Sequence, residues 1–158
     1  MGIDIRVSVP VDDDGFVRRA CPACSREFKW HNGPTEGAPE QESAAEEYFC
    51  PYCASPAAPD QWFTEEQIDY FRQVAIAEFA PKIRDDFTKA LEPLNRSGLL
   101  TAEVSGGDVG YPPPLTEDND MLMVASPCHP YEPVKVDETW SEPLHCLVCG
   151  KAYALPAH

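Results

Sequence analysis

The chain has few basic residues and no long apolar segment. Its 158 residues include 12 lysines and arginines against 27 aspartates and glutamates, which gives a formal net charge of −15. A surface with this excess of acid repels nucleic acids unless a basic patch interrupts it. No apolar run approaches the roughly 20 residues that a membrane helix needs, so we expect no transmembrane segment.

The amino terminus also lacks the apolar core of a secretory signal peptide. In MGIDIRVSVP, apolar and polar residues alternate with the two-residue period of a half-buried strand. The seven cysteines are odd in number, and six of them form Cys-x-x-Cys pairs, which favours metal ligands over a disulfide framework. We therefore expect a soluble cytoplasmic protein whose cysteines stay reduced.

Recognisable catalytic motifs are absent as well. The sequence contains no Gly-rich phosphate-binding loop, no His-Glu-x-x-His pattern, and no Ser-His-Asp or paired-carboxylate arrangement. Isolated histidines and aspartates do not define an active site. We therefore predict that the protein is not an enzyme.

The first two cysteine pairs have the spacing of a four-thiolate zinc site. Cys21 and Cys24 are followed, after the 25 residues from 25 to 49, by Cys50 and Cys53. A Cys-x-x-Cys turn directs two thiolates at one point, and two such turns make the closed tetrahedron of structural zinc. Because a closed site leaves no position for water or substrate, this zinc is expected to stabilise the fold and not to catalyse.

These pairs, with the β-rich sequence around them, resemble a zinc ribbon of the rubredoxin-like kind over roughly residues 1–60. The resemblance implies a structural metal site, with an iron-loaded electron carrier as the competing interpretation. Zinc ribbons usually place glycine directly after the second cysteine of a pair. Ser25 and Ala54 take those places here, so the two turns depart from the family pattern.

The third pair predicts a second metal site. Cys146 and Cys149 lie in CLVCG, which carries the ribbon glycine at Gly150. Tetrahedral zinc needs two more ligands. Cys128 is the third candidate, because the 17 residues from 129 to 145 include a strand-like PVKV segment that suits a ribbon hairpin. The pattern resembles a second, degenerate zinc ribbon over about residues 120–158.

The fourth ligand of this second site is open to several candidates. His129 is the first choice, because the prolines on both sides of the Cys-His dipeptide break a regular strand and let both side chains face one ion. His145 is a rival, as is a water molecule, which would give the site a catalytic character. Free thiols without metal are the alternative for the whole site. The carboxylate candidates are Glu132, Asp137 and Glu138.

Between the two cysteine clusters the sequence predicts a long helix. Residues 64–67 have the pattern of a capping box, and apolar residues then recur at helical spacing as far as Gly98. Pro81 is expected to kink or break this helix, because it has no N–H and clashes with the preceding turn. The segment VAIAEFA, at 74–80, is apolar nearly all round, so we expect burial on more than one side, between the two ends of the chain or, as the second option, against another subunit.

Together these patterns predict an α+β protein with two small β-rich, zinc-ribbon-like modules joined by a long helix. The expected domains are residues 1–60, a helical connector at 61–98, and a second β-rich module at 99–158. Two structural Zn²⁺ ions are the expected cofactors. Their predicted ligands are Cys21, Cys24, Cys50 and Cys53 in the first site, and Cys128, His129, Cys146 and Cys149 in the second.

The leading functional hypothesis is an adaptor that binds another protein, or a second copy of itself, through the helix. Candidate contacts are Phe71, Val74, Phe79 and Phe87. The alternative is a nucleic-acid-binding regulator, because basic and aromatic residues alternate around the first cysteine pair and would suit phosphates and stacked bases. The basic residues among them would also offset the excess negative charge of a four-thiolate zinc site. The basic and aromatic residues of this alternative are Arg18, Arg19, Arg26, Lys29 and Trp30.

Overall fold

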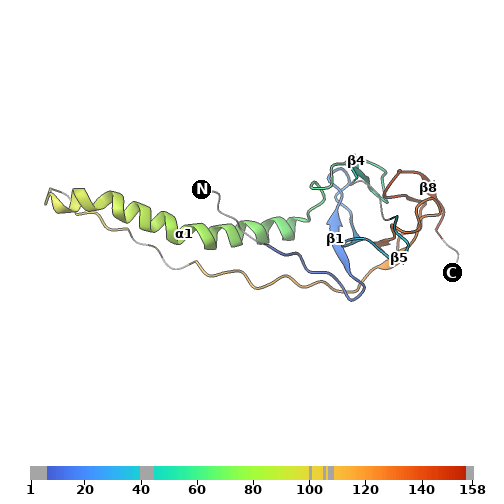
Figure 1. Cartoon of the computed structure of the whole chain (residues 1–158), viewed down its shortest axis with the longest axis horizontal. Coiled ribbons are helices and arrows are strands. Elements are labelled where there is room, and N and C mark those ends of the chain that lie inside the picture. Colours follow the sequence, from blue (N-terminus) through green and yellow to red (C-terminus); the bar gives the residue numbers. More distant parts are fainter. Residues whose placement is uncertain (1–6, 40–44, 100, 105, 107–108, 156–158) are drawn as a thin grey trace. The chain divides into compact units, whose positions relative to one another are not determined.

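The computed structural model describes residues 7–39, 45–99, 101–104, 106 and 109–155 (Figure 1). The chain forms two compact units. The first, which we call the cysteine unit, contains Val9–Glu65 and Leu115–His158 and carries all seven cysteines. The second, the helical unit, contains Met1–Ser8 and Glu66–Pro114.

The architecture combines one long helix with small antiparallel sheets, in agreement with the predicted α+β class. The largest sheet lies in the cysteine unit and has four antiparallel strands in the order β1-β2-β6-β5. These strands are β1 (Phe16–Ala20), β2 (Glu27–His31), β5 (Leu122–Val124) and β6 (Val134–Val136).

This sheet joins the two ends of the sequence, so the predicted arrangement of two separate ribbon modules is not confirmed. β2 comes from the predicted first module and β6 from the second, yet Trp30 is the cross-strand neighbour of both Val17 and Val134. A short strand shows in the sequence which of its faces is apolar, but it does not show which strand pairs with it. The two predicted modules share one sheet.

Two small hairpins complete the cysteine unit, and they are bonded to each other. The Phe49 N–H donates to the Leu147 carbonyl at 2.9 Å, and the His145 N–H donates to the Pro51 carbonyl at 2.8 Å. The second and third cysteine pairs therefore belong to one hydrogen-bonded body. The hairpins are β3 (Tyr48–Phe49) with β4 (Pro56–Ala57), and β7 (Leu144–His145) with β8 (Ala152–Tyr153).

Aromatic side chains fill the core of the cysteine unit. Phe28 and Trp62 are fully buried, with ring centroids 5.7 Å apart in an edge-to-face arrangement. Trp30, two residues along β2 from Phe28, packs against Trp62 as well, as the alternation of a strand requires. The Trp62 carbonyl accepts the Ala20 N–H at 2.9 Å. Trp62 thus links the chain after the second cysteine pair to β1.

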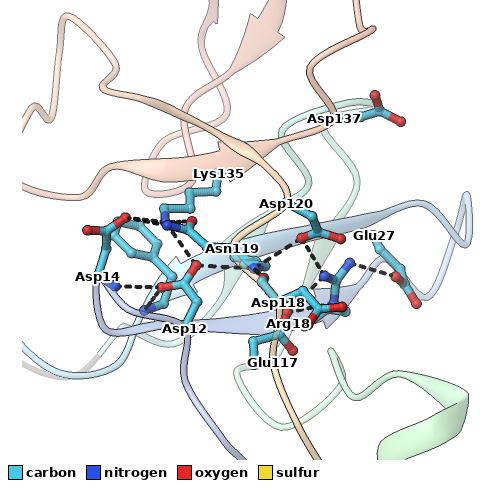
Figure 2. A network of polar contacts seen from close by, with 12 residues as sticks. Asp12, Asp14, Arg18, Glu27, Glu117, Asp118, Asn119, Asp120, Lys135 and Asp137 are labelled. Carbon is cyan, nitrogen blue, oxygen red and sulfur yellow. Dashed lines mark hydrogen bonds and ion pairs between the residues drawn. The ribbon is translucent and has the colours of Figure 1, made fainter.

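The residue between these two aromatics, Lys29, is also fully buried and lies directly across from Lys135 of β6. Asp12 separates the two charges: its Oδ2 lies 3.1 Å from the Lys29 Nζ and 2.9 Å from the Lys135 Nζ. Lys135 Nζ also lies 2.6 Å from Asp14 (Figure 2). Burial alone would raise the pKa of Asp12, but hydrogen bonds from Lys135, from the Phe16 N–H and from Lys29 outweigh it and hold that pKa well below its usual range.

The acidic segment 117–120 is held by the same network. Arg18 on β1 lies 2.8 Å from Glu117 and 2.6 Å from Asp120 (Figure 2). Lys29 lies 3.0 Å from Glu117. Lys29 also donates to the Asp118 carbonyl. Much of the acid in this part of the sequence is therefore paired inside the fold.

The helical unit contains α1 (Glu65–Arg96), which is not broken at Pro81. The helix continues through both Pro81 and Pro93 (Figure 1). Both prolines lie on exposed positions, where the carbonyl groups that lose their helical partners can be hydrated. Gly98, with φ of 73°, follows the helix end as the sequence predicts.

The chain that follows α1 contacts the helix at two places. The Asn95 side chain bonds both the N–H and the carbonyl of Ala102, and the Tyr111 hydroxyl donates to Glu78. Val74 and Ala77 are buried.

Within one chain the predicted burial of 74–80 on more than one side does not extend to Ile76, which lies between those two residues and is exposed. Burial against another subunit, the second option for this segment, stays a prediction. Across the residues that the structure describes, no helix combines the length and the apolar character that crossing a membrane requires.

Candidate metal centres

All three Cys-x-x-Cys pairs form the tip of a hairpin with the same backbone hydrogen bonds. In each, the first cysteine donates its N–H to the carbonyl five residues later, and it accepts a hydrogen bond from the residue that follows the second cysteine. Such a turn directs both thiols to the same side. The second set of bonds joins Ser25 to Cys21 at 2.9 Å, Ala54 to Cys50 at 2.9 Å and Gly150 to Cys146 at 2.8 Å.

The absence of glycine in the first two turns does not change their geometry. Ser25, Ala54 and Gly150 have φ of 65°, 63° and 76°, so all three adopt the left-handed conformation. For a residue with a side chain this costs roughly 1–2 kcal/mol. At Gly150 a side chain would meet a second obstacle, because a Cβ there would lie 2.8 Å from the Phe49 ring.

The first cluster brings together Cys21, Cys24, Cys50 and Cys53, whose sulfurs all lie within 4.8 Å of one another. The Cys21 and Cys53 sulfurs are 3.6 Å apart, and those of Cys24 and Cys50 are 3.8 Å apart. In a tetrahedral site with Zn–S bonds of about 2.3 Å, neighbouring sulfurs lie about 3.8 Å apart. The donor set and its separations therefore fit one zinc ion.

Backbone donors and burial support a cation at this first cluster. The N–H groups of Ala23 and Cys24 point at the Cys21 sulfur at 3.3 and 3.4 Å, and the Tyr52 N–H points at the Cys50 sulfur at 3.4 Å. Burial raises the pKa of Cys50 and also that of Cys24. Without a metal these thiols keep their protons, so four thiolates at this place require a cation.

The second cluster joins Cys128, His129, Cys146 and Cys149 within the same 4.8 Å limit. The sulfurs of Cys128 and Cys149 are 3.5 Å apart, and His129 Nδ1 lies 3.3 Å from the Cys146 sulfur. Tetrahedral zinc with Zn–S of about 2.3 Å and Zn–N of about 2.0 Å places two sulfurs about 3.8 Å apart and a sulfur and a nitrogen about 3.5 Å apart. Three thiols and one imidazole thus fit a second zinc ion, with Nδ1 as the nitrogen ligand.

The rival ligands lie elsewhere. His145 directs its Nδ1 at the Pro51 carbonyl, 3.2 Å away. Asp137 accepts hydrogen bonds from the backbone and the hydroxyl of Thr139 at 2.8 and 2.6 Å. Among the described residues, neither metal cluster contains a carboxylate or His145.

Ser126 is a member of this second centre that the sequence reasoning missed. Its side chain is buried, and its Oγ lies 3.2 Å from the Cys146 sulfur while accepting the His129 N–H at 3.1 Å. It therefore bonds one ligand and fixes the backbone of another, as outer-shell groups of metal sites do. A serine three residues before a candidate ligand is a local side-chain-to-backbone pattern that could have indicated it.

The second centre is the more exposed of the two. Cys21 and Cys50 of the first are buried and Cys53 is exposed, whereas Cys146 of the second is buried and both Cys128 and Cys149 are exposed. Burial would raise the pKa of Cys128, but hydrogen bonds with His129, Cys146 and Cys149 outweigh it and lower that pKa to about 6. Cys128 is therefore prepared as a thiolate ligand at neutral pH.

The candidate nucleic-acid residues are occupied within the protein. Arg18 and Lys29 belong to the ion-pair network of the cysteine unit. The Arg19 guanidinium lies 4.7 Å from the centre of the Trp30 ring, and that of Arg26 lies 4.8 Å from the centre of the Trp140 ring. The structure therefore does not gather these side chains into a basic surface.

Comparison with protein-family models, with curated proteins and with solved structures finds no match. The described residues form two four-ligand clusters, each built on at least one Cys-x-x-Cys hairpin, that could hold metal ions.

Proposed function

We propose that the protein is a zinc-stabilised adaptor, without catalytic activity, that acts by binding another protein chain in a reducing compartment such as the cytoplasm. The observation that carries this proposal is the pair of four-ligand clusters. A Cys₄ set and a Cys₃His set both match structural zinc, whose closed coordination leaves no position for a water nucleophile or a substrate. The metal then serves to hold the cysteine unit in shape.

An interaction role is supported by the helical unit. Of the four contacts predicted from the sequence, Val74 is buried, Phe71 and Phe79 are half-buried, and Phe87 is exposed. Exposed apolar side chains that gather on one surface are typical of protein–protein contacts. Phe87 is therefore the predicted contact that can reach another chain.

The two alternatives have weaker support. A nucleic-acid regulator needs accessible cations, and Arg18 and Lys29 are held by carboxylates. An iron-loaded electron carrier would suit the first cluster alone, because the second offers a histidine in place of the fourth thiolate.

Metal analysis of the protein as isolated tests the first part of the proposal. We expect about two zinc ions per chain and no iron–thiolate absorption. A red protein whose iron cycles between oxidation states would favour electron transfer instead. Submicromolar binding to single-stranded DNA with a steep salt dependence would favour the nucleic-acid alternative.

Cross-linking in the native cell tests the second part. Tagged wild-type protein should form a covalent complex with a second protein chain, which is identified by mass spectrometry. Phe87→Glu should lose this complex. Lys89→Glu, a charge change at another exposed position of the same helix, should keep it. Equal recovery from all three proteins, or no complex at all, would contradict the adaptor role.

A further inference from the structure

Four exposed apolar residues of α1 form one narrow stripe along the helical unit, and Ile68, which is 36 % exposed, lies outside it. Ile76, Ile83, Phe87 and Leu94 are 53, 55, 61 and 49 % exposed. With 3.6 residues per turn, their side chains fall within about 40° of one another around the helix axis. We call this set, together with Ala80 and Ala90, the apolar stripe.

The spacing of the apolar stripe indicates a helix as its partner. Ile76, Ile83 and Ala90 recur every seven residues, and so do Ala80, Phe87 and Leu94. These two series are the d and a positions of consecutive heptads, the pattern by which two helices pack with knobs into holes. A stripe with a period of 3.5 residues stays in register with a second helix along its whole length.

The stripe is also symmetric in sequence about Asp85. Ile76 and Leu94 lie nine residues before and after it, Ala80 and Ala90 lie five, and Ile83 and Phe87 lie two. If two copies of α1 cross antiparallel with Asp85 at the centre, each large apolar side chain meets a large one and each alanine meets an alanine. An interface between identical chains related by a twofold axis requires this kind of self-complementarity.

Charge does not oppose such pairing at the helix. Glu65–Arg96 contains seven acidic and five basic residues, so α1 carries −2 of the net charge of −15. The remaining −13 lies outside the helix. Two chains that associate through α1 therefore meet at a segment whose net charge repels a second copy only weakly.

We propose that the apolar stripe of one chain binds the same stripe of a second copy, with the two helices antiparallel. This inference rests on the proposed binding of another chain through the helix, and it identifies that chain. Ile76 then packs against Leu94 of the second copy, and Ile83 packs against Phe87 of the second copy. The outer face of each helix keeps its own extended segment, which contacts Glu78 and Asn95.

Sedimentation equilibrium of the full zinc-loaded chain, over a series from low to high micromolar concentration, tests the association. We expect a reversible monomer–dimer equilibrium for the wild type and for Lys89→Glu. Ile76→Asp and Leu94→Lys each bury a charge against an apolar side chain, so each should weaken dimerisation by at least about tenfold.

The double variant tests the orientation. Antiparallel pairing places Asp at 76 opposite Lys at 94 of the second copy, so Ile76→Asp with Leu94→Lys should recover dimerisation relative to either single variant. Parallel pairing places like charges opposite each other and gives no recovery. Zinc content and helical circular dichroism confirm that each variant is folded.

A wild type that stays monomeric, single variants that dimerise normally, or a double variant without recovery would each overturn this inference. The proposed function fails in a different way, through a wrong metal content or through cross-linking that does not depend on Phe87. A monomer that carries two zinc ions and cross-links through Phe87 to a different protein would overturn self-association alone.

Discussion

The cysteine unit and the helical unit are stabilised by different kinds of contact. The cysteine unit has strands of two to five residues, and its central sheet pairs β2 with β6 from the far end of the sequence. Strands this short are not stable alone. The helical unit has a helix of 32 residues whose backbone bonds are all local.

This difference indicates where bound metal would matter most. A small β-rich unit buries too little apolar surface to offset the entropy of closing long loops. The proposed zinc ions at the two cysteine clusters would add to a buried ion-pair network and supply what the strands lack. Loss of metal should therefore affect the cysteine unit far more than the helix.

Removal of zinc is the change with the largest expected effect. Structural zinc contributes on the order of 10–16 kcal/mol in small metal-dependent folds, which matches or exceeds the whole stability of a typical domain. A strong chelator should abolish the near-ultraviolet circular dichroism of the buried Trp62 and leave most of the helical signal. A metal-free protein with an unchanged near-ultraviolet spectrum would break the comparison.

The second-largest effect is expected at His129. His129→Ala should lower the zinc affinity of the second site by more than about 100-fold, because even outer-shell changes cost 10–100-fold. The matched control is His145→Ala. The His145 ring contacts the Pro51 carbonyl, so this variant should retain two zinc ions. Metal content after dialysis against a weak chelator measures both. Loss of zinc from His145→Ala but not from His129→Ala would reverse the ligand assignment.

The next largest effect, on the stability of the folded protein, is expected for Asp12→Asn. Asp12→Asn leaves Lys29 and Lys135 side by side without the buried carboxylate that lies between them. Breaking a buried ion pair on one side costs roughly 3–5 kcal/mol. The neighbouring Asp13 is exposed, so Asp13→Asn should change stability by less than about 0.5 kcal/mol. Chemical denaturation of the zinc-loaded proteins compares the two.

The pH dependence of this effect has a definite sign. The pKa of Asp12 is lower in the folded protein than in the unfolded chain, so its stabilisation is complete above pH about 4 and is lost as the pH falls further. The difference in stability between wild type and Asp12→Asn should therefore be constant from neutral pH down to about pH 5. A difference that already shrinks near neutral pH would contradict the assignment to Asp12.

The smallest effect is expected at Ser126. Ser126→Ala removes one hydrogen bond to the Cys146 sulfur and one to the His129 N–H, and should weaken zinc binding at the second site by about 10–100-fold. Ser141→Ala, at an exposed position, serves as the control. Competition with a chromophoric chelator measures both. Equal affinities for the two variants would show that Ser126 does not support the site.

The features that could be predicted from the sequence are those encoded by local spacing. The seven cysteine ligands follow from the cysteine intervals, and His129 is the first choice among several candidates for the eighth; the structure places all eight in two clusters. The helix also follows from a local signal, since its start after Thr64 and its end before Gly98 are marked by their own residues.

The features that could not be predicted depend on contacts between distant segments. The burial of Lys29 requires Asp12 and Glu117, which lie 17 and 88 residues away in the sequence. A basic residue beside aromatics has the same sequence pattern whether it faces solvent or a buried carboxylate. The pairing of β2 with β6 is hidden for the same reason, because the short strands do not specify their neighbours.

X-ray absorption at the zinc edge of the fully loaded protein reports the ligands of both metal ions. We expect two zinc ions per chain that share seven Zn–S bonds of about 2.3 Å and one Zn–N bond of about 2.0 Å. The average environment should therefore contain 3.5 sulfur ligands and 0.5 nitrogen ligands per zinc, without a bound water. A spectrum with an oxygen ligand, or with four sulfurs on a single zinc and no second ion, would contradict two closed structural centres.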